Sequence, residues 1–260
     1  MNCVKMKLVK GMAVGLLAGW LLAGCSSGYS LAGVEGGRIA ITDKYDRNAD
    51  PEALSILKPY QQKVDSIMKP VIGHSAKALS AYRPESPLSN WIADVLRQSA
   101  VRAIGKPADV AVMNMGGIRN AMPEGEITYG TIYEIAPFEN ALCVLTMDGA
   151  TLKELFVEIA SVHGEGLSGA ALQIDEEGNL LDAKVNGRPV EEKKVYTVAT
   201  IDYLAEGNDR MMAFRKAQSK TFPKDALLRG LLLDAVKQCE QKGQFVSAQV
   251  EGRIKVSASN

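Results

Sequence analysis

Histidine is scarce in this sequence of 260 residues, and its cysteines lack the spacing that binds metals. The two histidines, His74 and His163, stand far apart, and neither has the neighbouring Asp, Asn or His that holds two metal ions about 4 Å apart in a hydrolase. None of the four cysteines belongs to a Cys-x-x-Cys pair, which excludes a zinc site built on such pairs. We therefore predict no metal site and no catalytic residue on this chain.

Dense positive charge is also missing. Lysine plus arginine and aspartate plus glutamate each number 30, so the formal net charge is zero, and no more than two basic residues are adjacent. DNA and RNA binding depends on concentrated positive charge. The composition therefore excludes a nucleic-acid partner.

The sequence lacks the common nucleophile and phosphate-loop motifs as well. Neither Gly-x-Ser-x-Gly nor Gly-x-x-x-x-Gly-Lys occurs. Residues 164–169 fit the loose pattern Gly-x-Gly-x-x-Gly, but they follow an expected helix rather than a strand, so we reject a dinucleotide-binding interpretation.

The N-terminus has the features of a leader. Three lysines and no acid occur in the first ten residues, and the apolar stretch that follows at 11–22 is too short for a permanent membrane helix. It ends in Leu22-Ala23-Gly24-Cys25, which resembles a bacterial lipobox. We predict that residues 1–24 are a lipoprotein signal peptide and that Cys25 is lipidated; the alternative is an ordinary signal peptide with a chance cysteine.

A lipidated Cys25 would make the protein a bacterial membrane-anchored lipoprotein on the periplasmic or cell-surface side, bound to the membrane through its acyl chains. Residues 25–45 have the composition of a tether, and we expect residues 46–260 to form the folded domain, since 47% of the sequence is hydrophobic and 23% charged. An oxidising compartment would allow a disulfide between Cys143 and Cys239, but we favour two free, buried thiols.

Helical and extended patterns alternate along the rest of the chain. Apolar residues recur at helical spacing from Pro51 to Met68, where Asp50 can cap the helix and Pro70 can end it. Further helices are expected over 86–104, 128–136, 150–162 and 224–242, strands over 71–79, 109–113, 140–147, 195–201 and 249–256, and a two-stranded hairpin within 171–185. This interleaving predicts an α/β or α+β fold.

Three turns carry polar or aromatic side chains. Asn114-Met115-Gly116-Gly117-Ile118-Arg119 follows an expected buried strand; its glycines permit a tight turn and a close ligand, and the Arg119 guanidinium suits phosphate or carboxylate. Pro137-Phe138-Glu139-Asn140 carries an aromatic ring, which on its own is more often part of a core. Residues 200–209 lead a strand into a loop that contains Tyr203 and Asp209.

Together these segments resemble the C-terminal, substrate-recognition domain of the 5'-nucleotidases. The likeness rests on Asn-x-Gly-Gly-Ile-Arg at 114–119, on Gly-Glu-Ile-Thr-Tyr-Gly at 125–130 followed by Pro-Phe-x-Asn at 137–140, on the run from Tyr196 to Asp209, and on residues 83–94. Order and spacing agree over about residues 80–256. The resemblance implies an α/β fold, a layered α/β/β/α sandwich of the 5'-nucleotidase C-terminal domain type.

The resemblance also implies which side chains would bind a nucleotide. Phe138 and Tyr203 would stack the nucleobase between their rings, a contact that tolerates many bases. Arg83 and Arg119 would face the phosphate.

Four further residues would complete this implied site. Asn114 and Asn140 would contact the base or its junction with the sugar, Asp209 would accept the ribose hydroxyls, and Gly169 would flank the base where a side chain would clash. The sequence departs from the family where the usual Gly-Gly-Asp-Gly reads Gly207-Asn208-Asp209-Arg210, which adds a charged side chain beside the expected ligand.

In that family a separate N-terminal domain holds two metal ions and hydrolyses the substrate. About fifty residues lie between Cys25 and the recognised region, too few for that domain, so we predict the recognition half alone. We expect this chain to bind a nucleotide or nucleoside and to serve nucleotide catabolism together with a separately encoded metallophosphoesterase. That partner would carry the divalent metals, and we expect no cofactor on this chain. The alternatives are a stand-alone nucleoside- or nucleotide-binding lipoprotein without catalysis, and a relative that kept the fold but lost the pocket.

Overall fold

The computed structural model describes residue 31 and residues 33–257, and the chain divides into two units between Ala53 and Leu54. The described part of the first unit is mostly irregular and contains a short 3-10 helix, η1 (Asp43–Asn48). The predicted signal peptide and the lipidation of Cys25 lie outside the described residues. Within the described part of the chain, no helix is both long and apolar enough to cross a membrane.

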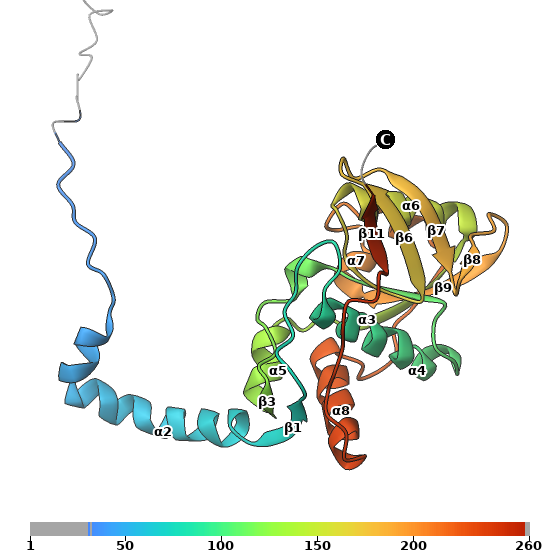
Figure 1. Cartoon of the computed structure of the whole chain (residues 1–260). Coiled ribbons are helices and arrows are strands. Elements are labelled where there is room, and N and C mark those ends of the chain that lie inside the picture. The colour runs from blue at the N-terminus through green and yellow to red at the C-terminus, as the bar shows by residue number, and fades with distance from the viewer. Residues whose placement is uncertain (1–30, 32, 258–260) are drawn as a thin grey trace, which may run out of the picture. The chain divides into compact units, whose positions relative to one another are not determined.

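The helices follow the predicted order closely. They are α2 (Pro51–Met68), α3 (Pro87–Ser99), α4 (Val101–Ile104), α5 (Tyr129–Ile135), α6 (Gly149–Ser161), α7 (Asp202–Ala205) and α8 (Leu228–Gln241), with the 3-10 helices η2 (Met115–Gly117) and η3 (Met212–Lys216) (Figure 1). Short polar side chains cap several of them. The Asp148 carboxylate accepts the backbone N–H of Thr151 at 2.8 Å at the start of α6, a bond that lowers the pKa of Asp148.

The strands form three sheets. A five-stranded sheet has the order β10 (Ser219–Thr221), β4 (Leu142–Asp148), β9 (Val195–Ile201), β2 (Val110–Met113), β5 (Gly166–Ser168). A four-stranded sheet has the order β11 (Ile254–Ser257), β6 (Ala170–Asp175), β7 (Leu180–Val185), β8 (Arg188–Pro189), and β1 (Val71–Ser75) pairs with β3 (Gly125–Thr128). Of the strand pairs among the described residues, only β2 with β9 and β11 with β6 are parallel, so both larger sheets are mixed.

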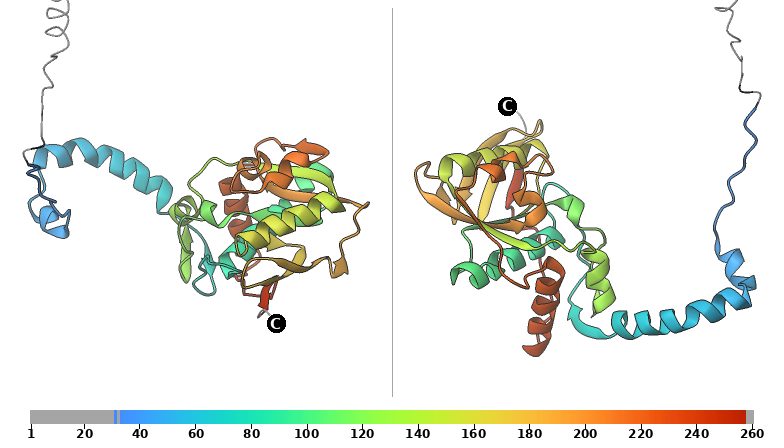
Figure 2. Two further views of the ribbon diagram at one scale, coloured as in Figure 1. Left: turned by 90° about the horizontal axis from the view of Figure 1, so that it is seen from above. Right: turned by 180° about the vertical axis from the view of Figure 1, so that it is seen from behind.

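The core lies where the helices pack on these sheets. Helix α3 packs against β2, β5 and β9, whereas α6 contacts strands of both larger sheets and runs along them (Figure 2). Helix α6 also packs against η3, and Phe156 of α6 and Phe214 of η3 are the largest fully buried side chains of the described residues. The arrangement confirms the predicted layered α/β sandwich.

Several predicted boundaries are wrong for identifiable reasons. The helix expected over 86–104 divides at Ala100, and the one expected over 224–242 begins only at Leu228. Its first residues instead bond to the start of β4, where the Leu142 N–H donates to the Ala226 carbonyl at 2.8 Å. The strand expected over 249–256 begins only at Ile254, because the buried side chains of Glu85 and Asn90 bond the backbone at Glu251 and Gln249. The unpredicted β5, β10 and α7 have three or four residues each, too few to show a periodicity.

Candidate functional site

A cavity of about 300 Å³ opens at one edge of the five-stranded sheet. Because β2 and β9 are parallel, both end at this edge, the first leading into Asn114 and the second into Asp202. The segment before β4 reaches the same edge, since Leu142 pairs with Ile201. The residues that line the cavity are Asn114, Gly116, Gly117, Phe138, Asn140, Ile201, Tyr203 and Asp209. Three turns that are far apart in sequence thus bring together five of the eight predicted site residues.

Two aromatic rings form exposed walls of this cavity. The side chains of Phe138 and Tyr203 are 50% and 42% exposed, although large aromatic residues are usually buried. The guanidinium carbon of Arg119 lies 6.0 Å from the centre of the Phe138 ring, and Arg119 Nη1 donates to the Gly116 carbonyl at 3.1 Å. Arg119 is therefore at the rim, beside one ring and next to a lining glycine.

The Asp209 carboxylate is held by two donors. The Tyr203 hydroxyl donates to Asp209 Oδ1 at 2.9 Å, and Asn114 Nδ2 donates to Asp209 Oδ2 at 2.6 Å. The bond from Tyr203 to this carboxylate raises the pKa of the Tyr203 hydroxyl. Asp209 and Arg210 both adopt left-handed backbone conformations, with φ of +54° and +66°, which are costly for residues other than glycine. The loop thus fixes one acceptor in the cavity at the cost of local strain.

Asn114 supplies an unsatisfied acceptor to the same cavity. Its side chain is almost completely buried, with 4% exposed, and Oδ1 has no hydrogen-bond partner among the described residues. A buried polar atom without a partner is unusual and costs free energy. A Cβ on Gly117 would lie 2.7 Å from this oxygen, so a larger residue there would have to displace the Asn114 side chain. Asn140 also lines the cavity, and its Nδ2 donates to Asp202 Oδ1 at 3.0 Å.

The comparison with known families agrees with these motifs. The family model described as 5'-nucleotidase, C-terminal domain, matches residues 71–216. The chain belongs to this family.

Relatives of this 5'-nucleotidase C-terminal domain are longer proteins. Endonuclease YhcR of Bacillus subtilis is 32% identical over 175 residues, which cover 64% of this chain and 14% of that protein. The silent protein UshA(0) of Salmonella typhimurium is 30% identical over 179 residues, which cover 66% of this chain and 32% of that protein. The chain therefore spans less than a third of the length of these relatives.

The solved structures give the same result for the fold. A 5'-nucleotidase precursor from Thermus thermophilus superposes with a TM-score of 0.69 at 27% identity, over 79% of this chain and 43% of its own. The NAD nucleotidase of Haemophilus influenzae superposes with a TM-score of 0.59 at 20% identity, over 82% of this chain and 42% of its own. In both structures this fold forms part of a longer chain.

Arg83 is not among the residues that line the cavity. Its Nε donates to the Gly164 carbonyl at 2.8 Å, and its Nη2 forms an ion pair with Glu165. The other carboxylate oxygen of Glu165 accepts the backbone N–H of Met115, in the turn that carries Asn114. Burial raises the pKa of Glu165, which is only 3% exposed.

Sequence reasoning missed Glu165, because one glutamate in a loop after a helix carries no recognisable pattern. The structure makes it a positioning residue, since it connects Arg83 to the Met115 backbone. The predicted contact of Arg83 with phosphate stays a prediction.

Gly169 belongs to a different place in the fold. Its φ is +77°, and a Cβ there would clash with the Asp109 carbonyl and lie 2.7 Å from Arg97 Nε. The residue lines a separate polar depression with Arg97 and Arg253, not the aromatic cavity. Local packing therefore requires glycine at this position, whereas the family resemblance explains the glycine by contact with a base.

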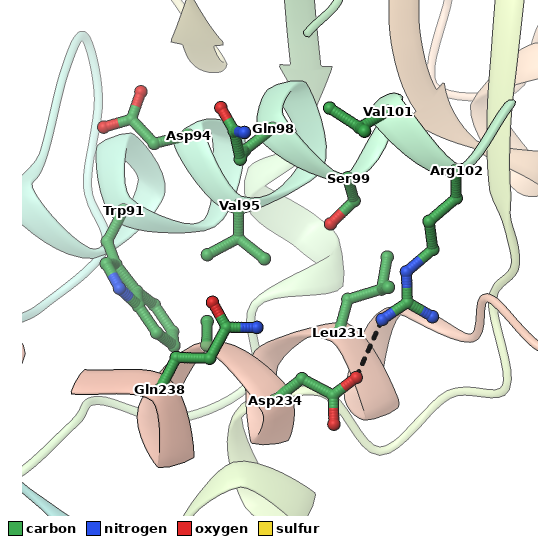
Figure 3. Close-up of a pocket in the computed structure, with 11 residues that line it drawn as sticks. Trp91, Asp94, Val95, Gln98, Ser99, Val101, Arg102, Leu231, Asp234 and Gln238 are labelled. Atoms are coloured by element: carbon green, nitrogen blue, oxygen red, sulfur yellow. Dashed lines mark hydrogen bonds and ion pairs between the residues drawn. The ribbon is translucent and has the colours of Figure 1, made fainter. Parts of the chain in front are cut away.

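A larger groove, of about 450 Å³, has helices α3 and α4 on one side and helix α8 on the other (Figure 3). Trp91, Val95 and Leu231 line it, and an ion pair of 2.8 Å between Arg102 and Asp234 joins its two sides. None of the predicted site residues lines this groove.

Metal-ligating side chains do not gather anywhere in the described part of the chain, which holds no group of three or more His, Cys, Asp or Glu suited to a metal ion. Cys143 and Cys239 are both free thiols. Burial raises the pKa of the Cys143 thiol to about 11, so this thiol is protonated and unreactive at neutral pH.

Proposed function

We propose that this chain recognises nucleotides through the aromatic cavity. The observation that carries the proposal is the pair of half-exposed rings, Phe138 and Tyr203, on one cavity that also presents a fixed carboxylate and an unsatisfied amide oxygen. A nucleobase has two flat faces and polar edges, so it stacks on the rings and supplies a donor to Asn114 Oδ1. Each stacked face contributes about 1–3 kcal/mol.

The polar residues of the cavity suit the remainder of a nucleotide. Asp209 is already held in place, so its carboxylate accepts ribose hydroxyls without reorganising. Arg119 on the rim offers a planar set of N–H donors to a phosphate. Arg83, 41% exposed and anchored by Glu165, is the second candidate for a phosphate contact.

For hydrolysis we infer a separately encoded metallophosphoesterase. It would bring the divalent metals and the activated water, and this chain would hold base, ribose and phosphate in place. The absence of a metal-ligating group among the described residues is the observation that supports this division of labour. A lipid on Cys25 would keep the complex at the membrane, on the periplasmic or cell-surface side, where it would serve nucleotide catabolism.

Calorimetry with adenosine and AMP tests the recognition step. Phe138→Ala and Tyr203→Ala should each weaken the binding of both ligands about 5- to 150-fold, because each removes one stacked face. Arg119→Ala should weaken AMP binding about tenfold and leave adenosine unchanged, since a nucleoside gives the guanidinium no phosphate to bind. Failure of the unaltered protein to bind either ligand would overturn the proposal.

The second candidate is a stand-alone binding lipoprotein that captures nucleosides or nucleotides without chemistry. The lack of a metal-ligating group in the described residues favours it equally. AMP turnover separates the two, because a recognition subunit accelerates hydrolysis by its metallophosphoesterase and a stand-alone binding protein does not.

A further inference from the structure

Helix α2 exposes an apolar stripe along one face. With about 100° of rotation per residue, Leu54, Ile56, Leu57, Tyr60, Val64 and Ile67 fall within one half of the helix circumference. These six side chains are 50% to 69% exposed, and no residue of α2 is buried. The opposite face carries Lys58 and Gln62, which suit solvent.

A stripe of this kind needs a partner. Soluble proteins rarely leave six large apolar side chains together in water, and such faces usually mark interaction sites. At the end of the helix, Asp65 forms an ion pair of 2.6 Å with Lys69, so charged side chains there satisfy each other. The helix is thus built to bury one side only, as helices that dock into grooves do.

The position of α2 in the chain indicates which partner covers it. The Thermus thermophilus structure covers 79% of this chain, or about 205 residues, whereas residues 71–260 number only 190. The superposed region therefore extends into the residues before Val71, where α2 lies. Because the matched domain is C-terminal, the rest of that longer chain precedes it, and a helix at this place is where the preceding part of the chain joins the domain.

We propose that the apolar stripe of α2 docks into an apolar groove of the separately encoded metallophosphoesterase. The partner's identity rests on the proposed function, and the docking face rests on α2 alone. Binding on one side of α2 would replace the covalent connection of the longer relatives with a noncovalent one. The other conceivable occupants, a second copy of this chain or a lipid surface, are outcomes of the test.

Site-specific photocrosslinking in the native cells tests the docking face. The photoreactive p-benzoylphenylalanine replaces Tyr60 on the stripe or Gln62 on the opposite face of the same helix, and mass spectrometry identifies the adducts. We expect position 60 to yield an adduct with a metallophosphoesterase chain at least about tenfold more efficiently than position 62. An adduct with a second copy or with phospholipid, equal yields at both positions, or no adduct would overturn the proposal.

A variant separates this proposal from the nucleotide proposal. Val64→Glu places a charge on the stripe and should abolish co-purification with the metallophosphoesterase, whereas Gln62→Glu should leave it unchanged. Because residue 64 is exposed, Val64→Glu should leave AMP binding and the melting temperature unaltered. If the wild-type chain forms the crosslink but does not bind AMP, the nucleotide proposal alone is refuted. A missing crosslink with AMP binding intact would refute the docking proposal alone.

Discussion

Two hollows of the domain, the aromatic cavity and the helical groove, differ in what builds them. The aromatic cavity of about 300 Å³ is made by three turns at one edge of a sheet, and the groove of about 450 Å³ is made by the sides of helices α3, α4 and α8. The groove is the larger, yet its lining is that of an ordinary helix contact with an ion pair across it. The cavity contains exposed rings, strained backbone and an unsatisfied buried oxygen.

The difference lies in the backbone that forms each hollow and not in the volume. Helix sides present side chains that are fixed by their own helix, so a groove between them needs no special backbone. Turns at strand ends can be shaped by unusual φ values and by hydrogen bonds to the backbone, and such costly features persist where a ligand uses them. Three sites of substitution sharpen this comparison, in order of expected effect.

The largest effect is expected for Glu165→Ala, which removes the carboxylate that holds the turn carrying Asn114. The variant leaves the Met115 N–H without its acceptor and frees the Arg83 guanidinium. The free energy of unfolding should fall by about 1–3 kcal/mol, since a buried donor loses its partner. Urea denaturation measures this loss, and calorimetry with AMP should show weaker binding because the turn that carries Asn114 loosens. Full stability and unchanged AMP affinity would show that the cavity does not depend on Glu165.

Glu165→Gln is the matched control, because it keeps the shape of the side chain and removes its ionisable carboxyl group. Burial raises the pKa of Glu165 from its usual value of 4.5, so the native state holds this proton more tightly than the unfolded state. The resulting stabilisation is complete below pH 4.5 and is lost as the pH rises through the raised pKa. The wild type should therefore lose stability relative to Glu165→Gln as the pH rises through that window. A difference between the two that does not change with pH would contradict a raised pKa.

A smaller effect of opposite sign is expected for Arg210→Gly. Arg210 has a φ of +66°, which glycine adopts without strain. Glycine removes the backbone strain of the folded state, but it also raises the conformational entropy of the unfolded chain. The first effect is the larger, so the free energy of unfolding should rise by about 0.5–1 kcal/mol. Thermal melting measures the gain, and Arg210→Ala, which keeps a Cβ, should show none. Equal stability of the two variants would mean that the loop is not strained at this residue.

The smallest effect is expected in the groove, for Arg102→Ala. Arg102 and Asp234, which form the ion pair, are each about half exposed. Such pairs contribute less than about 1 kcal/mol to the free energy of unfolding. AMP affinity should not change, because Arg102 does not line the aromatic cavity. A tenfold loss of AMP affinity in calorimetry would place the groove in the binding function and would end the distinction between the two hollows.

Much of the architecture was predictable from local patterns. The helix at Pro51–Met68 and the strand at Val195–Ile201 have the predicted bounds, because periodicity and capping residues act within a few positions of the chain. The motifs at 114–119 and 137–140 and the loop with Tyr203 also pointed to five of the residues that line the cavity. Their roles in binding a nucleotide stay predictions.

Other features depended on contacts between distant segments. The side chain of Glu165 meets Arg83 and Met115, which are 82 and 50 positions away, and no local pattern encodes such a meeting. Gly169 looked like a ligand-side glycine, but its neighbours are Asp109 and Arg97, which pack against it from elsewhere in the fold.

The amphipathic helices show where the limit lies. The sequence specified both α2 and α3 as helices with an apolar side, since periodicity is a property of the chain alone. Folding buries Leu88, Ile92 and Leu96 of α3 under the sheet and leaves Leu57 and Val64 of α2 exposed. Burial requires a second surface, and a surface is formed by segments that only folding brings together. For that reason the apolar side of a helix can be read from the sequence, and the surface that covers it cannot.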